Sequence, residues 1–145
     1  MVPTLYGRIQ TRIVLTIVVG GLWTLIITPF LPTGEALGPS YRMTFAVLLA
    51  VLVLGIVWEF IYHGLQQFRW EKDWPTFFGL LTGINEGLLV WILIKAGAVP
   101  GVDPNLPASV FLIQFITTWL VIFLVVNGPV QIFFSRWRFR GGRFW

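Results

Sequence analysis

The sequence contains no cysteine and a single histidine, His63. The lack of cysteine excludes disulfides and thiolate chemistry. Zinc sites usually recruit several His or Cys ligands, and helical di-iron sites repeat a Glu-x-x-His motif that is missing here. The one metal alternative is Glu59 and His63 at i, i+4 with Glu86 as a third ligand, which would need more ligands from other chains. We therefore predict no metal and no cofactor.

The usual sequence motifs of enzymes are absent as well. There is no Gly-Lys-Ser or Gly-Lys-Thr phosphate loop and no Gly-x-Gly-x-x-Gly dinucleotide turn. A nucleophilic triad needs a base beside an activated Ser, Thr or Cys, and the only histidine lies within an apolar segment. We do not expect an enzyme.

Charge is scarce, since charged residues make up 11% of the chain and hydrophobic residues 57%. This composition is typical of membrane proteins, in which a span needs roughly 20 apolar residues. The first apolar run is too long for a secretory signal, and three more runs follow it, so we expect it to remain in the chain. The sequence predicts an all-α polytopic membrane protein, one domain over residues 1–145, with four transmembrane helices near 11–30, 43–66 (extending toward 72), 75–94 and 108–126.

The basic residues predict the orientation, because cytoplasmic loops are enriched in Lys and Arg. Only Arg42 and Lys95 flank the two Pro- and Gly-rich connectors, near residues 32–39 and 99–107. The other basic residues lie before the first helix, between the second and third, and after the fourth: Arg8, Arg12, Arg69, Lys72, Arg136, Arg138, Arg140 and Arg143. Both termini are therefore expected in the cytoplasm, with the chain in the plasma (inner) membrane.

Two glutamates interrupt the apolar runs and are the main candidates for a site. Asp73 lies in the short connector between the second and third helices. Glu59 precedes it and Glu86 follows it at similar distances along the chain. At about 1.5 Å per residue, both lie roughly 20 Å from this turn and share a depth in the membrane. Each belongs to the small and polar face of its helix, and the supporting polar residues are Tyr62, Gln66, Thr82 and Asn85.

Two interpretations of these carboxylates remain open. In the first, they stabilise packing: His63 or Tyr62 holds Glu59, and a protonated Glu86 binds Thr82 or a carbonyl. In the second, the pair shares a proton or binds a cation, because two adjacent carboxylates resist ionising together. His63 would then relay protons toward the cytoplasm, since an imidazole changes charge near neutral pH.

Small residues predict close helix packing. The third helix carries Gly79, Gly83 and Gly87 four residues apart, a spacing that lets a neighbouring backbone approach. The first helix has a weaker stripe of the same period that includes Gly20. We expect the first and third helices, or two copies of the third, to meet along these stripes.

The C-terminal segment, residues 127–145, alternates aromatic and basic side chains. Such a segment is typical of an interfacial anchor, in which aromatic rings rest at headgroup level and arginines attract anionic lipid. A docking arm for a partner protein is the alternative, and nucleic acid is not expected. The contact residues would be Arg136, Trp137, Arg138, Arg140 and Arg143.

Two functional hypotheses follow from these features. The first is ion, proton or small-solute handling by an oligomer or complex subunit, through the paired glutamates. The second is a non-catalytic accessory or assembly subunit of a larger membrane complex. Because a four-helix bundle has little interior volume, either role predicts a homo-oligomer or a larger complex in the bilayer.

Overall fold

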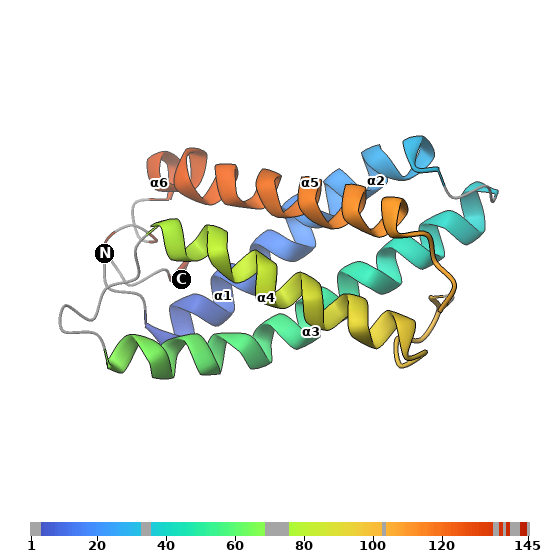
Figure 1. Cartoon of the computed structure of the whole chain (residues 1–145). Helices are drawn as coiled ribbons and strands as arrows, with labels where there is room; N and C mark the ends of the chain where they lie inside the picture. Colours follow the sequence, from blue (N-terminus) through green and yellow to red (C-terminus); the bar gives the residue numbers. More distant parts are fainter. Residues whose placement is uncertain are drawn as a thin grey trace.

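The computed structural model describes residues 4–32, 36–68, 76–102, 104–134, 137, 139, 143 and 144. These residues contain helices and no strand, and four helical stretches are long and apolar enough to cross a membrane. Figure 1 shows them as a bundle of antiparallel neighbours. The elements, in chain order, are α1 (Leu5–Leu15), the π-helical turn η1 (Thr16–Gly20), α2 (Gly21–Ile27), the 3-10 turn η2 (Thr28–Phe30), α3 (Leu37–Gln67), α4 (Thr76–Lys95), α5 (Ala108–Asn127) and α6 (Pro129–Phe133).

The prediction of an all-helical chain with four membrane-compatible helices is confirmed, but the first two helices begin earlier than predicted. The first span starts at Leu5 instead of residue 11, because the Thr4 side chain accepts a hydrogen bond from the Gly7 N–H (3.0 Å) and caps the helix there. The second starts at Leu37 instead of residue 43, and Pro39 is tolerated because the first turn needs no N–H donor. The expected extension toward residue 72 lies outside the described residues.

The π-helical turn η1 keeps one stripe of the first span buried along its whole length. Residues four apart drift by about 40° around an ideal α-helix, so a stripe with this spacing would soon leave the interior. At η1 the Gly21 N–H reaches the Thr16 carbonyl, five residues back, which widens the turn and opposes the drift. The buried members of this stripe are Arg8, Thr16, Gly20, Thr24 and Thr28.

The glycine stripe of α4 packs on α5. An ideal Cβ on Gly83 would lie 2.7 Å from Trp119 Nε1, and one on Gly87 would lie 2.8 Å from a Phe115 ring carbon. We expected the first helix or a second copy of the third helix at this stripe. The large aromatic rings of α5 fill the groove instead, because glycine leaves a flat surface on which a ring can lie as readily as a backbone can.

An apolar core fills the end of the bundle where η2 closes the first span and α4 leads to α5. Ile94 and Val110 are fully buried there, and Met43 and Val47 of α3 belong to the same cluster. Helix α4 ends at Lys95, and Gly97 just beyond it has a positive φ of 75°, which lets the Ala98 N–H return to the Leu93 carbonyl at 2.9 Å. The interior of this end of the bundle is therefore mainly apolar.

The C-terminal segment returns to α1. Trp137 is only 6% exposed, and its indole N–H donates to Thr11 Oγ1 at 2.8 Å. The Phe144 N–H donates to the side chain of Gln10 at 2.9 Å. The expected lipid contacts of Arg136, Arg138 and Arg140 lie outside the described residues, whereas Arg143 is partly buried. Trp137, which we expected at the lipid interface, packs inside the bundle with Leu15 and Val130.

Candidate functional site

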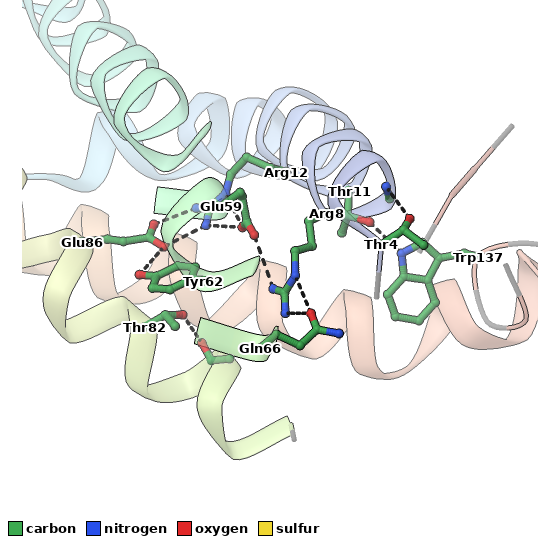
Figure 2. Close-up of polar contacts among 12 residues, drawn as sticks. Thr4, Arg8, Thr11, Arg12, Glu59, Tyr62, Gln66, Thr82, Glu86 and Trp137 are labelled. Carbon is green, nitrogen blue, oxygen red and sulfur yellow. Dashed lines mark hydrogen bonds and ion pairs between the residues drawn. The ribbon is translucent and has the colours of Figure 1, made fainter. Parts of the chain in front are cut away.

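Four charged side chains meet inside the half of the bundle that contains α1 and the end of α3. We call them the charge network: Arg8 and Arg12 of α1, Glu59 of α3, and Glu86 of α4 (Figure 2). Their side chains are 7%, 9%, 11% and 2% exposed, in that order. Two positive and two negative groups are thus removed from solvent together, and their formal charges cancel.

Arg12 bridges the two carboxylates. Its Nη2 donates to Glu59 Oε1 at 2.7 Å and to Glu86 Oε1 at 2.8 Å. Its Nη1 donates to Glu86 Oε2 at 2.7 Å, and its Nε donates to Glu59 Oε1 at 3.2 Å. All three guanidinium nitrogens therefore contact a carboxylate. A planar guanidinium suits this task because its donors are fixed in a fork that matches carboxylate oxygens.

Arg8 extends the network by one helical turn. Its Nη1 lies 3.5 Å from Glu59 Oε2, while its Nε and Nη2 donate to Gln66 Oε1 at 3.2 and 2.7 Å. Gln66 is almost fully buried, with 1% of its surface exposed. Arg8 therefore links the carboxylate pair to the C-terminal turn of α3.

Tyr62 gives Glu86 a further hydrogen-bond donor. Its hydroxyl donates to Glu86 Oε1 at 3.1 Å, and its ring stacks on Trp58 with centroids 5.6 Å apart. The bonds from Arg8 and Arg12 already give each of the four carboxylate oxygens of Glu59 and Glu86 at least one donor. Neither Glu59 nor Glu86 therefore has a carboxylate oxygen without a donor.

A glycine makes room for the bridging guanidinium. An ideal Cβ on Gly55, one turn before Glu59 on α3, would lie 2.8 Å from Arg12 Nη1. Any larger residue at this position would push the guanidinium away from the carboxylates. On its other side, Arg12 faces the ring of Trp119, with the guanidinium carbon 5.8 Å from the ring centroid, which adds a cation–π contact.

Only some of the predicted site residues come together. The structure brings Glu59, Glu86, Tyr62 and Gln66 into one network. His63, the expected relay, is partly buried, and its Nε2 lies 3.4 Å from the Gln67 side chain instead.

Two more predicted polar residues lie apart from the network. Thr82 is buried, but its hydroxyl donates to the Gly79 carbonyl at 2.9 Å, within its own helix. Asn85 faces away from the bundle and is exposed.

The two arginines of the network were not among the predicted site residues, because their position before the apolar run is also that of a cytoplasmic flank. The signal that could have found them is the four-residue period of Thr16, Gly20, Thr24 and Thr28. Continued backward, this period leads to Arg12 and then to Arg8. Intramembrane charges seek partners of opposite sign, so two unpaired glutamates were themselves a reason to look for basic residues on a neighbouring helix.

Four helices of this length and hydropathy indicate a small integral membrane protein. Comparison with protein families, with curated proteins and with solved structures finds no match for the chain. Among the described residues, no three His, Cys, Asp or Glu side chains are grouped so that they could hold a metal ion.

Proposed function

We propose that the chain is a non-catalytic integral membrane subunit, and that its charge network fixes the arrangement of α1, α3 and α4 so that the bundle can assemble with other membrane polypeptides. The observation that supports this proposal most directly is the closed hydrogen bonding of Glu59 and Glu86. Because every carboxylate oxygen accepts a bond from Arg8, Arg12 or Tyr62, an ion would have to displace a guanidinium to bind.

The energies of buried ion pairs and of helix association in lipid agree with a structural role. Removing one partner of a buried ion pair leaves a charge without compensation and costs about 3–5 kcal/mol. In lipid, helices gain little from burying apolar surface against one another, so polar contacts and close packing determine how they associate. A network that joins three helices through one guanidinium therefore specifies a single arrangement of the bundle.

The first test is a double-mutant cycle on Arg12 and Glu86. We expect Arg12→Met and Glu86→Met each to lower the free energy of unfolding by about 3 kcal/mol, and the double variant to lose less than the sum. Unfolding in mixed detergent micelles can be followed by the fluorescence of the eight tryptophans. Additive losses would argue against a coupled network.

A second candidate function is proton or ion handling. One observation favours it: polar side chains form a continuous hydrogen-bonded chain from Glu86, near the middle of α4, to Gln66, at the end of α3. Such a chain could pass protons if Arg12 released one carboxylate.

Flux in vesicles separates the two functions. Under the structural proposal, vesicles containing the purified chain dissipate an imposed pH gradient no faster than protein-free vesicles, and Glu86→Gln does not change this rate. A dissipation that the wild type accelerates and Glu86→Gln abolishes, in a variant that still folds, would establish ion handling and overturn the structural proposal.

A further inference from the structure

One polar side chain faces out of the bundle in the middle of a membrane-compatible helix. Asn85 is exposed, and it follows the first residue of α4 by nine positions and precedes the last by ten. At about 1.5 Å per residue, its amide lies roughly 14 Å from each end of the helix. In a bilayer, this position is close to the midplane.

The amide of Asn85 has no hydrogen-bonding partner within the described part of the chain. Lipid offers none at this depth, because the hydrocarbon region is about 30 Å thick and its polar groups lie at the two surfaces. Polar groups left unsatisfied in hydrocarbon cost several kcal/mol. Only another protein segment can bring a donor and an acceptor to this depth.

The surroundings of Asn85 form a continuous apolar face. Leu81, Leu88 and Ile92 lie within about 60° of Asn85 around the helix, and they are 40%, 58% and 59% exposed. We call these four residues the Asn85 face. It points away from the glycine stripe, which α5 covers.

We propose that the Asn85 face binds the same face of a second copy of this chain, in a parallel two-fold dimer in which the two Asn85 amides hydrogen-bond to each other. An amide has both a donor and an acceptor, so two identical amides related by a two-fold axis complement each other. A second copy inserted with the same topology carries its amide at the same depth. A leucine-rich surface on either side of the amide pair supplies the van der Waals contact that helix association in lipid requires.

This inference does not depend on the proposed function, since the Asn85 side chain is exposed and takes no part in the hydrogen bonds of the charge network. Failure of the dimer would leave the structural role of Arg12 and Glu86 in place. Conversely, a chain that conducts ions could still dimerise through this face.

The absence of cysteine makes the test direct. Single cysteines are introduced at Leu81, Leu88 and Ile92, and, as controls on an exposed face of α3, at Val53 and Val57, which are 54% and 57% exposed. The full chain is reconstituted in phosphatidylcholine vesicles at low protein density and oxidised with copper phenanthroline. We expect covalent dimers from the α4 positions and few from the α3 positions.

Association is then measured by energy transfer between labelled chains in the same vesicles. We expect Asn85→Leu to weaken association about tenfold, which corresponds to about 1.4 kcal/mol, and Asn85→Gln to retain most of it. Asn85→Leu should leave the unfolding midpoint of the monomer unchanged in dilute detergent. A monomer in vesicles, equal cross-linking at both sets of positions, or a dimer indifferent to Asn85→Leu would each overturn the proposal.

Discussion

At the residue scale, the charge network depends on the shape of one guanidinium. Arg12 contacts Glu59 and Glu86 with three nitrogens, and the two carboxylates belong to different helices, α3 and α4. A single point charge of the same sign could neutralise one carboxylate well but could not span both. The geometry of Arg12 is thus as important as its charge.

The difference between a planar guanidinium and a single point charge predicts that Arg12→Lys is not a conservative substitution. We expect it to lower the free energy of unfolding by about 2 kcal/mol, because hydrogen bonds to charged groups are worth about 1.5–3 kcal/mol and the ammonium cannot keep all of them. The measurement is denaturation in mixed micelles. The matched control is Arg42→Lys, an exposed site on α3 that should show no change. Equal effects at both sites would contradict the bridging role.

At the element scale, the sequence predicts the helices well and their packing less well. Apolar length and turn residues place α4 and α5 close to their observed bounds, because a span must cover the hydrocarbon thickness whatever it packs against. The partner of a helix face is a tertiary property. The glycine stripe could be identified as a close-packing surface, yet nothing local to it indicates that the rings of Phe115 and Trp119 cover it.

In the candidate site, too, the polar face of each helix could be predicted from the sequence, whereas the partners from another helix could not. Periodicity places Glu59 and Tyr62 on one face of α3 and Glu86 on the polar face of α4, and these side chains do come together. The arginines were missed because basic residues before an apolar run are also typical of a cytoplasmic flank. Whether Arg8 and Arg12 lie inside or outside the helix depends on the Thr4 cap and on partners that are distant in sequence.

The contact between α4 and α5 can be tested with a pair of glycines. We expect Gly83→Ala to destabilise the bundle by about 1–3 kcal/mol, because the new methyl group would lie within 3.0 Å of three atoms of the rigid Trp119 ring. Gly21→Ala, also within a helix, has no atom within 4 Å of its new methyl group. It should be neutral or stabilise by up to about 1 kcal/mol.

Thermal unfolding in one detergent gives both values. Because each substitution replaces a helical glycine by alanine, the gain in helix propensity is similar at both sites and cancels in the comparison. If Gly83→Ala were as well tolerated as Gly21→Ala, Trp119 would not be packed on the α4 backbone.

At the scale of the whole molecule, the charge network leaves fewer basic residues to determine the orientation of the chain in the membrane. Arg8 and Arg12 lie inside a helix and are compensated by glutamates, so they no longer count as flanking charges. The basic residues that remain on one side of the membrane are Arg69, Lys72 and the C-terminal arginines, and those on the other side are Arg42 and Lys95. This bias still predicts both termini in the cytoplasm.

Labelling of single cysteines in intact cells tests this topology, since the chain has no native cysteine. Phe68, at the end of α3, is 88% exposed, and Ala98, between α4 and α5, is also exposed. Because α4 runs from one end of the bundle to the other, these positions lie at opposite ends (Figure 1). We expect a membrane-impermeant maleimide to label Ala98→Cys in intact cells and Phe68→Cys only after permeabilisation. The reverse pattern would place the termini outside. It would also mean that the C-terminal arginines do not determine the orientation of the chain.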